Sequence, residues 1–477
     1  MSTLFQEGRQ IINVGLQSFA DSIVKAGGKS VQLDWTPPAG GNRAAGWCLA
    51  QLLNHPDVER ANETAYAAFL AAQPLLTGIG IARQQLPEMQ ERMILHAGPP
   101  IAWAEMCGPM QGAVIGAILY EGWAADVDAA RGLAQGGTIA FAPAHHHAAV
   151  GPMAGVISPS MPVWVVENAA GGNRAYSNLN EGLGKVLRFG ANSAEVIKRL
   201  HWMAQVLAPA LSAALAKHGP LELKPLIAQA LQMGDEVHNR NAAASSLFLK
   251  KIVPAALHSG FDATAIADAV TFIAGNDHFF LNLSMVACKS MLDAAHGVKD
   301  SSLVTAMSRN GVRFGVRLSG TGEQWFEAPS PVVGGLYFPS YGPEHAAPDM
   351  GDSSITETAG LGGFAMATAP AIVQFVGGTP QDAIANTHEM RNITLGRNSA
   401  LTLPAMNFSG TPAGIDARRV LDTNILPIIN TGIAHKEAGV GQIGAGITRA
   451  PLECFTQAVI ALAARMQVSV PAGIGPA

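Results

Sequence analysis

The densest group of polar side chains in this sequence lies at residues 234–241, which read G-D-E-V-H-N-R-N. Only 14% of the 477 residues are charged, against about 25% in an average globular protein. Ordinary solvated surface is therefore a poor explanation for this window. An apolar stretch at residues 226–233 precedes it and predicts a helix whose end aims the polar residues into a cleft. The residues that we assign to proton transfer and substrate binding there are Asp235, Glu236, His238, Asn239, Arg240 and Asn241.

Two histidines, His145 and His147, have the spacing of a metal-binding pair. In an extended segment their side chains point the same way, and a carboxylate or a third histidine from elsewhere would complete a site for a divalent metal. Alternatively, such a pair hydrogen-bonds backbone or substrate oxygen atoms, and the short pattern favours this second interpretation.

Arginine recurs every fourth residue at Arg309, Arg313 and Arg317, and Asn310 follows the first. On a helix or a strand this spacing places all three arginines on one side. Guanidinium groups bind carboxylate and phosphate oxygens in a two-pronged geometry, which suits an anionic substrate. A row of surface ion pairs explains the pattern equally well.

A polar segment at residues 349–358 leads into the glycine-rich residues 360–363 and a predicted helix at 364–376. Ser353, Ser354 and Thr356 could hold an oxyanion together with backbone N–H groups, and Glu357 adds a carboxylate. A helix cap with a tight turn is the alternative. The lysine-containing spacing of a nucleotide triphosphate loop is absent.

Three further residues are candidates for chemistry because of their settings. His96 precedes a rigid Gly-Pro-Pro, and His435 and Lys436 precede a glycine-rich run. Either histidine could move a proton near neutral pH. Nucleophilic catalysis is not supported, because no G-x-S-x-G motif occurs and none of the four cysteines has a C-x-x-C partner.

Composition narrows the class of protein and its partners. The net charge of −5 and the lack of a lysine or arginine block argue against nucleic acid or a membrane surface as a partner. Apolar residues make up 48% of the chain and glycine occurs 52 times, which is typical of a tightly packed enzyme or a homo-oligomer. Residues 1–9 lack the apolar core of a secretory signal and no run of about 18 apolar residues occurs, so we expect a cytoplasmic protein.

The order of the helices and strands that position these residues indicates an α/β and α+β multidomain fold. Residues 11–14, 19–26 and 30–34 read as strand, helix and strand, which opens a Rossmann-like α/β domain over residues 1–95. No G-x-G-x-x-G is present, so no dinucleotide site is predicted. Residues 182–296 form a mainly helical domain, and residues 96–181 with 297–477 form an α+β core. The helices predicted in the middle domain are 194–207, 209–218, 223–233, 242–258, 262–273 and 283–296.

Five longer segments carry a family resemblance: L-D-W-T-P-P (33–38), I-L-H-A-G-P-P-I (94–101), residues 234–241, 355–372 and I-A-H-K-E-A-G-V-G-Q-I-G-A-G-I (433–447). On these segments the chain resembles, over nearly its whole length, the bacterial YahG/YlbE family. The resemblance implies an N-terminal Rossmann-like layer, a helical insert and two unusual α+β regions. The family pattern H-x-H falls on His145 and His147. Arg309 and Arg317 also fall on positions of the family pattern, whereas Arg313 does not.

The resemblance also implies an activity. YlbE-type proteins are understood as subunits of oxamate carbamoyltransferase, which work with a succinyl-CoA-synthetase-like partner in allantoin breakdown and pass carbamoyl phosphate to carbamate kinase. This chain would then belong to a carbamoyltransferase-like complex that acts on a small anionic N-carbamoyl (ureido) compound. The S-x-R-T and H-P-x-Q signatures of aspartate- and ornithine-type transcarbamoylases are absent, because His55-Pro56 is followed by Asp57-Val58.

Our mechanistic hypothesis is that phosphate, as co-substrate, attacks the ureido carbonyl and that the tetrahedral oxyanion collapses to carbamoyl phosphate and a released amide. His238 or His96 supplies the proton, with His435 as a further candidate, and Asp235, Glu236 and Glu357 orient the imidazole. No other cofactor is assigned. Two alternatives stay open: a metal-dependent amidohydrolase that uses His145 and His147, and a non-catalytic subunit. The residues assigned to anion and substrate binding are Arg240, Arg309, Arg317, Asn239, Asn241, Asn310, Ser353, Ser354, Thr356 and Lys436.

Overall fold

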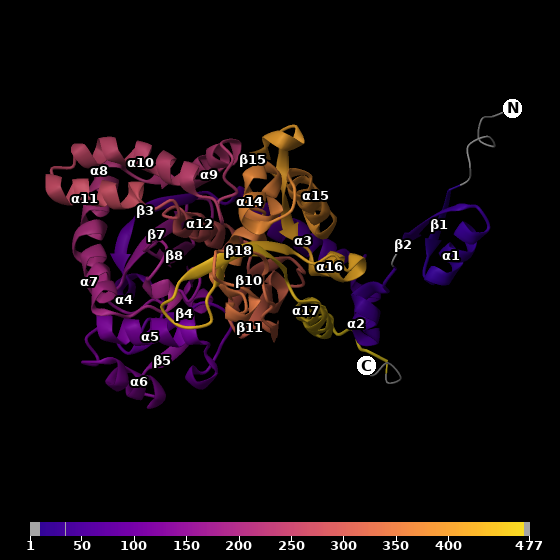
Figure 1. The fold of residues 1–477 in the computed structure, drawn as a ribbon, viewed down its shortest axis with the longest axis horizontal. Coiled ribbons are helices and arrows are strands. Elements are labelled where there is room, and N and C mark those ends of the chain that lie inside the picture. The colour runs from indigo at the N-terminus through magenta and orange to yellow at the C-terminus, as the bar shows by residue number, and fades with distance from the viewer. Residues whose placement is uncertain (1–9, 34, 472–477) are drawn as a thin grey trace.

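The computed structural model describes residues 10–33 and 35–471 as a mixed α+β, multidomain protein (Figure 1). Most of the chain forms one body of small sheets and covering helices, and a short N-terminal unit stands beside it. Residues 1–9, on which the signal-peptide expectation rested, lie outside the described residues. Among the described residues, no helix is both long and apolar enough to span a membrane.

The N-terminal unit consists of β1 (Gln10–Val14), α1 (Gln17–Lys25) and β2 (Lys29–Leu33). The two strands are parallel, so the predicted strand–helix–strand unit is confirmed. The α/β layer does not continue to residue 95, however. The next strand, β3 (Pro74–Ile81), pairs antiparallel with strands of another sheet, and the helix α2 (Arg43–Leu52) packs against α17 (Leu452–Arg465) near the other end of the chain.

A five-stranded sheet with the order β6–β8–β7–β3–β9 carries the helical layer of the molecule. The helix α12 lies against β7 and β8, and α8 lies against β3. The helices of this layer occur where the apolar periodicity predicts them. A π-helical turn at Met203–Leu207 precedes Pro209, which has no N–H to donate. The elements are α3 (Pro56–Ala71), β6 (Ala149–Val150), β7 (Pro162–Asn168), β8 (Arg174–Asn178), β9 (Leu221–Glu222), α7 (Ala194–Trp202), α8 (Ala208–His218), α9 (Leu223–Gln232), α10 (Ala242–Leu257), α11 (Ala263–Ala274) and α12 (Leu281–Asp293).

Three small antiparallel sheets form the other half of the body. Their strand orders are β12–β11–β10–β14, β13–β18–β17 and β15–β16. The parallel pair β4–β5 and the helices α5 and α6 complete it. The elements are α4 (Ala82–Gln85), β4 (Met93–His96), α5 (Gly108–Tyr120), α6 (Val127–Gln135), β5 (Ala140–Pro143), β10 (Val304–Asn310), β11 (Arg313–Leu318), β12 (Phe326–Pro329), β13 (Gly334–Tyr337), β14 (Met350–Gly351), α13 (Ile355–Thr358), α14 (Val373–Val376), α15 (Pro380–Met390), β15 (Thr394–Leu403), β16 (Ser409–Ile415), α16 (Ala417–Thr423), β17 (Ile428–Ala434) and β18 (Gln442–Arg449).

Two local predictions are wrong. The three arginines do not share one side, because β10 and β11 form a hairpin that turns at Gly311, where φ is +80°. Arg309 therefore lies on one strand and the other two arginines on the next. The predicted helix at residues 364–376 is instead a series of 3-10 turns followed by α14, since glycines before it and Pro370 within it interrupt regular helical hydrogen bonding.

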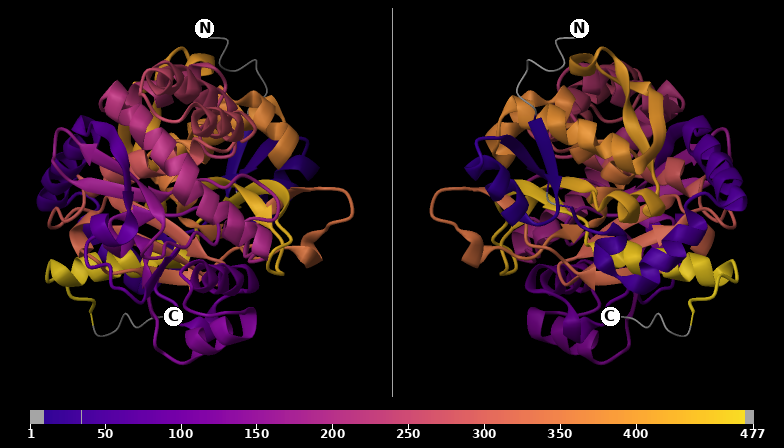
Figure 2. Two further views of the ribbon diagram at one scale, coloured as in Figure 1. Left: turned by 90° about the vertical axis from the view of Figure 1, so that its left-hand side faces the viewer. Right: turned by 90° about the vertical axis from the view of Figure 1, so that its right-hand side faces the viewer.

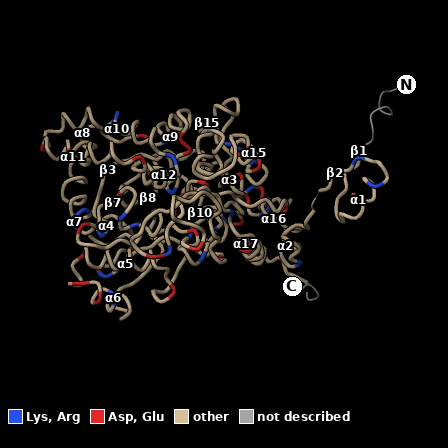
Figure 3. Tube along the Cα trace, viewed as in Figure 1, with Lys and Arg blue, Asp and Glu red and all other residues tan. Residues whose placement is uncertain are grey.

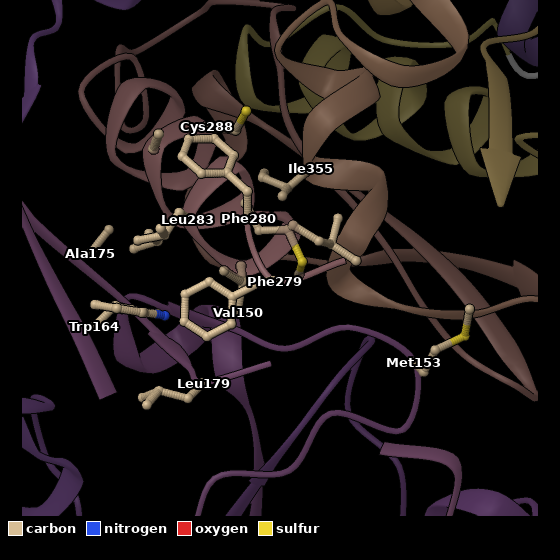
Figure 4. Packing of buried hydrophobic residues seen from close by; sticks show 14 of the residues in the cluster. Val150, Met153, Trp164, Ala175, Leu179, Phe279, Phe280, Leu283, Cys288 and Ile355 are labelled. Atoms are coloured by element: carbon tan, nitrogen blue, oxygen red, sulfur yellow. The ribbon is translucent and has the colours of Figure 1, made fainter. Parts of the chain in front are cut away.

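The main hydrophobic core links the five-stranded sheet to the segment that carries Glu357 (Figure 4). Trp164 of β7 meets Phe248 and Phe279 edge-on, with ring centroids 6.0 Å apart in both pairs. Further along α12, buried side chains reach Ile355 at the start of α13. Burial of each such side chain stabilises the fold by about 1.5–3 kcal/mol, so the core fixes the position of the short α13 helix.

Lys and Arg are interspersed with Asp and Glu along the chain trace without a block of one sign, as Figure 3 shows. This agrees with the low charge of the sequence. The segment around β13 projects from the side of the molecule, next to the turn between β17 and β18 (Figure 2). The backbone of Lys436 donates a hydrogen bond to His345 O at 2.8 Å, which ties the turn to this projection.

Candidate active site

The loop at residues 234–241 is folded around the carboxylate of Glu236. The backbone N–H groups of His238, Asn239 and Arg240 donate to its oxygens at 3.2, 2.6 and 3.0 Å. Burial raises the pKa of Glu236 to about 7, although His238 and these N–H groups act in the opposite direction. Val237 between them has φ of +57°, a conformation that a β-branched residue adopts only when its surroundings force it.

Asp235 fastens the same loop to the helix that follows. Its Oδ2 accepts a hydrogen bond from the N–H of Ala244 in the first turn of α10 at 2.9 Å. A carboxylate at a helix N-terminus is favourable because that end carries a partial positive charge. Asp235 therefore positions the loop rather than facing a ligand.

His238 is held by a buried carboxylate on α13. Its Nδ1 lies 2.7 Å from Oε1 of Glu357, and the two side chains are 4% and 0% exposed. Glu357 also accepts a hydrogen bond from Gly363 N–H at 2.9 Å, and its Oε2 lies 3.0 Å from the Thr356 hydroxyl oxygen. Because a carboxylate can only accept, Nδ1 carries the hydrogen and Nε2 is left with its lone pair. The arrangement gives a proton acceptor of fixed orientation.

Glycine at position 362 is required by this contact. A Cβ added there would lie 2.1 Å from Oε1 of Glu357 and 3.1 Å from Cβ of His238. Its φ of +52° also lies in the left-handed region. The glycine-rich run that follows Glu357 thus makes room for the acid–imidazole pair, and it does not form an anion-binding loop.

Three asparagines beside this pair have buried polar atoms without a hydrogen-bond partner among residues 10–33 and 35–471. These atoms are Nδ2 of Asn239, Oδ1 of Asn241 and Oδ1 of Asn430 on β17. Each asparagine is anchored to the Glu236–His238 loop: Asn239 by its backbone, Asn241 by donating to His238 O at 2.6 Å, and Asn430 by donating to Glu236 at 3.2 Å. Buried donors and acceptors left free in this way suit a ligand that offers both, such as an amide or ureido group.

A cavity of about 290 Å³ opens at this loop. Arg240 lines it, and the only hydrogen bond of its guanidinium to the described residues runs from Nε to Gly234 O at 3.3 Å. Burial, together with nearby Arg188 and His238, lowers the pKa of His278 to about 3, so this wall residue is neutral at physiological pH. The lining residues are Leu183, Asn239, Arg240, Asn241, Ala242, Asp277, His278, Phe338, Phe375, Gln442 and Ala445.

A second group of buried polar residues, which we call the imidazole–cation cluster, comprises His96, His145, Lys289, Arg317 and Asp352. Nε2 of His145 lies 3.6 Å from Asp352, and Asp352 accepts hydrogen bonds from the N–H groups of Gly98 and Gly151, both at 2.9 Å. Burial raises the pKa of Asp352 to about 6 and lowers that of His96 to about 4. Burial and the two nearby cations lower the pKa of His145 further.

Both cations of this cluster have acidic partners. Lys289 Nζ lies 2.6 Å from Asp293, and Arg317 Nη2 lies 2.5 Å from Glu323. The guanidinium of Arg317 also stacks on Trp325, with 5.5 Å between its Cζ and the ring centroid. The sequence predicts that Arg317 binds an anion. In the structure this arginine lies in a cluster whose cations have acidic partners, apart from the residues that line the cavity at Arg240.

The segment at residues 349–358 connects the two groups but offers few free side chains. Arg309 donates to Asp349 at 2.7 and 2.8 Å and to Gly351 O, Ser353 and Thr431 with its remaining N–H groups. Because every N–H group of the buried Arg309 side chain has a partner, Arg309 holds the segment in place. Its assignment to anion binding is corrected accordingly.

The hydroxyls and the amide assigned to substrate are also used within the fold. Ser354 donates to Met307 O at 2.5 Å and Thr356 to Ser353 O at 2.7 Å. The Asn310 amide donates to Pro99 O at 3.1 Å, and its oxygen caps the β10–β11 turn. These side chains position the 349–358 segment and the turn beside it.

The predicted metal pair does not form. Residues Ala144–His147 are a 3-10 turn and not an extended segment, so the two histidines diverge. His147 Nδ1 lies 2.6 Å from Pro87 O, whereas His145 faces Asp352. Within residues 10–33 and 35–471 no group of three or more His, Cys, Asp or Glu side chains is arranged to hold a metal ion.

His435 and Lys436 lie at the β17–β18 turn, away from the acid–imidazole pair. The His435 ring stacks on His345 at 5.8 Å, and its Nδ1 accepts a hydrogen bond from Glu437 N–H at 2.9 Å. Lys436 Nζ donates to Glu344 O at 2.8 Å and is exposed. Residues 234–241, Glu357 and Asn430 thus lie together, and His435 and Lys436 do not join them.

Several residues of the two groups were not predicted from sequence. Asn430 is the polar residue of the otherwise apolar strand start Ile428-Ile429, and Lys289 is the one cation of the largely apolar α12. A lone polar residue within a buried apolar element is a usable signal, because its burial needs a partner. Asp277, His278 and Trp325 carry no such signal.

The fold and the site define a mixed α+β protein with a buried acid–imidazole pair, next to loop residues that line a cavity. A family model described as oxamate carbamoyltransferase subunit AllG matches residues 139–353. The chain is 49% identical to the AllG protein of Escherichia coli (strain K12) over 414 residues, 86% of this chain and 99% of that protein. It is 46% identical to YahG of the same strain over 461 residues, 96% of this chain and 98% of that protein.

A solved structure agrees with these sequence relatives. The crystal structure of a conserved protein of unknown function from Enterococcus faecalis V583 matches with a TM-score of 0.84 and 47% identity, covering 85% of this chain and 98% of that one. The chain belongs to the AllG/YahG family. The family resemblance read from the five sequence segments is confirmed, and so is a relation to subunits of carbamoyltransferase complexes.

Proposed function

We propose that this chain is the substrate-binding and carbamoyl-transferring subunit of a complex that cleaves a small anionic N-carbamoyl compound with phosphate. The observation that carries the proposal is the set of unpartnered buried amide atoms of Asn239, Asn241 and Asn430 around the His238–Glu357 pair. The name of the relative AllG, an oxamate carbamoyltransferase subunit, supports the same class of reaction. By family resemblance, the partner is a succinyl-CoA-synthetase-like chain.

The substrate's anionic end is assigned to Arg240. Its terminal nitrogens form no hydrogen bond with the described residues and line the cavity of about 290 Å³. A guanidinium binds a carboxylate or phosphate with two parallel hydrogen bonds. The ureido group then meets one donor, on Asn239, and two acceptors, on Asn241 and Asn430, which matches the carbonyl and N–H groups of an N-carbamoyl compound.

The proton is assigned to Nε2 of His238. An oxygen of hydrogen phosphate attacks the ureido carbon, and Nε2 takes the phosphate proton as the new C–O bond forms. The tetrahedral oxyanion collapses, the C–N bond breaks, and the same proton passes from Nε2 to the leaving nitrogen. The products are carbamoyl phosphate and the released amide, so atoms and charge balance. Glu357 keeps the imidazole oriented and stabilises it while it is protonated.

The test is a phosphorolysis assay on the purified chain, alone and with its co-purified partner, that follows carbamoyl phosphate by ³¹P NMR. We expect product only from N-carbamoyl compounds that carry a carboxylate, and only with phosphate present. Arg240→Ala should raise KM by about 10–100-fold for loss of a charged hydrogen-bonding pair. Arg131→Ala, which removes an exposed arginine on α6, is the matched control and should leave KM unchanged.

Two outcomes would contradict the proposal. Turnover by the complex that is indifferent to both Arg240→Ala and His238→Ala would assign this chain a non-catalytic, structural part. Hydrolysis that needs a divalent metal and no phosphate would assign it to the amidohydrolase class instead.

A further inference from the structure

The cavity at Arg240 has an apolar part of its wall as well as the polar side chains of the 239–241 loop. Leu183, Phe338 and Phe375 line it, and 49%, 44% and 48% of these residues is exposed. Single exposed apolar side chains are normal on a protein surface. Three of them around one cavity fit a small-molecule site, because such sites combine apolar walls with a few polar groups that orient the ligand.

The two aromatic residues of this wall are carried by regular structure. Strand β13 pairs antiparallel with β18, and the N–H of Phe338, directly after β13, donates to Ile443 O at 2.8 Å. Phe375 belongs to α14, which packs against both β13 and β18. Neither ring is needed to fill the hydrophobic core, since each is nearly half exposed. Their position at the cavity is therefore available for a ligand.

Three kinds of chemical group thus meet at one cavity. The guanidinium of Arg240 suits a carboxylate, the free amide atoms of Asn239 and Asn241 suit a ureido group, and the apolar wall suits an apolar group. In an N-carbamoyl amino acid, a single carbon carries the carboxylate, the ureido nitrogen and the side chain. Such a compound presents all three groups at once, whereas a ureido compound without a side chain leaves the apolar wall in water.

We propose that the substrate is the N-carbamoyl derivative of an amino acid with a large apolar side chain, and that Phe338 and Phe375 are specificity-determining residues. This substrate class rests on the proposed function, because the carboxylate and ureido groups bind the residues assigned there. The cavity volume of about 290 Å³ lies at the lower end of small-molecule sites, roughly 300–1,000 Å³, which suits a ligand of amino-acid size. Burial of the side chain should tighten binding by about 10–100-fold.

The experiment measures binding to the full chain by calorimetry without phosphate, so it does not depend on turnover. The ligands are N-carbamoylglycine and each enantiomer of N-carbamoylleucine. We expect one enantiomer to bind at least about 10-fold more tightly than the glycine compound, with a more negative heat-capacity change because apolar surface is buried. Phe338→Ala and Phe375→Ala should each weaken binding of that enantiomer several-fold more than binding of N-carbamoylglycine.

The matched control is Phe261→Ala. This phenylalanine is 37% exposed and does not line the cavity, so its truncation should leave the ratio of the two affinities unchanged. Circular dichroism checks that all three variants are folded.

The proposal is overturned by equal affinities for the glycine and leucine compounds, by no binding of either, or by a leucine preference that both cavity variants retain. In the last case, loss of a co-purified partner from Phe375→Ala would assign the apolar wall to a protein interface. The phosphorolysis assay separates this result from the proposed function. Carbamoyl phosphate formed without a leucine preference overturns the substrate class alone, and a leucine preference without carbamoyl phosphate overturns the reaction alone.

Discussion

Two groups of buried polar residues are joined by the 349–358 segment, and they differ in which polar atoms lack a partner. In the imidazole–cation cluster, Lys289 and Arg317 each have an acidic partner and Asp352 accepts backbone N–H groups. Nε2 of His96, both ring nitrogens of His145 and Nε of Arg317 have no hydrogen-bond partner among the described residues. Around His238, a carboxylate orients the imidazole, but amide atoms of three asparagines have no partner among the described residues.

The charges of the first group are paired, whereas two of the three asparagines of the second group line the cavity at Arg240. A buried charge without a partner is too costly to keep, so paired ions indicate a structural purpose. A buried amide atom without a partner costs about 1–3 kcal/mol, a cost that binding of a complementary ligand recovers. The number of charges alone would have favoured the imidazole–cation cluster, and the cavity lined by Asn239, Arg240 and Asn241 favours the His238 loop.

The largest effect that tests this comparison is loss of the imidazole. His238→Ala should lower kcat by about 100–10,000-fold, the usual contribution of a positioned acid or base, and the melting temperature should also fall, because the buried Glu357 carboxylate loses its imidazole partner. His145→Ala in the other group should change stability and leave kcat within a few-fold. Equal losses of kcat in the two variants would mean that the two groups act together.

Arg309 should show the opposite behaviour to a catalytic residue. Arg309→Ala leaves Asp349 as an uncompensated buried charge, and unfolding free energy should fall by about 3–5 kcal/mol. Urea denaturation measures this. Arg313→Ala, on the exposed side of the same hairpin, is the control and should cost less than about 1 kcal/mol. A stable Arg309→Ala protein with a raised KM would return this arginine to the anion-binding set.

The pH dependence of stability should reveal Glu236. Its pKa is raised to about 7 in the fold from an ordinary value of 4.5, so the folded state holds a proton that the unfolded state has lost. Stability therefore falls as pH rises from about 4.5 to 7, by roughly 3 kcal/mol for this one group. Glu236→Gln removes the titration, and the difference in unfolding free energy between wild type and variant should carry this slope. A difference that is flat with pH would show that Glu236 is ionised throughout.

The smallest expected effect concerns the free amide of Asn239. No hydrogen bond of its side chain to the described residues would be lost in Asn239→Ala, so unfolding free energy should change by less than about 0.5 kcal/mol. Binding of the N-carbamoyl compound should weaken by about 10-fold, measured by calorimetry, because one donor to the ureido carbonyl is removed. A stabilised protein with unchanged affinity would indicate that this donor meets no ligand.

The fold could be predicted in its local parts. Apolar periodicity placed the helices of residues 194–293 to within a few residues, because each has a stripe that must face a core. It failed at residues 364–376, where glycines directly precede an apolar run and a proline lies within it. It also missed that β3 leaves the N-terminal unit for another sheet, since strand pairing depends on partners distant in the chain.

The candidate site could be predicted in part. Residues 234–241 were identified because a dense polar window is unusual in a chain with so few charges, and Glu357 was identified from the T-E-T segment. That these two meet at 2.7 Å, and that Asn430 joins them, was not predictable. The structural role of Arg309 was not predictable either. Its spacing matched an anion site, but all its donors bind Asp349 and neighbouring residues.

The sequence by itself determined the residue types available for chemistry, the helical and strand periods, and the family to which the chain belongs. Only the tertiary structure decided which of those residues have partners and which are free. The physical reason is that hydrogen-bond satisfaction and burial are properties of neighbours in space: Asp349 neutralises Arg309 from 40 positions away along the chain, and the cavity at Arg240 is lined by residues from six separate stretches of sequence.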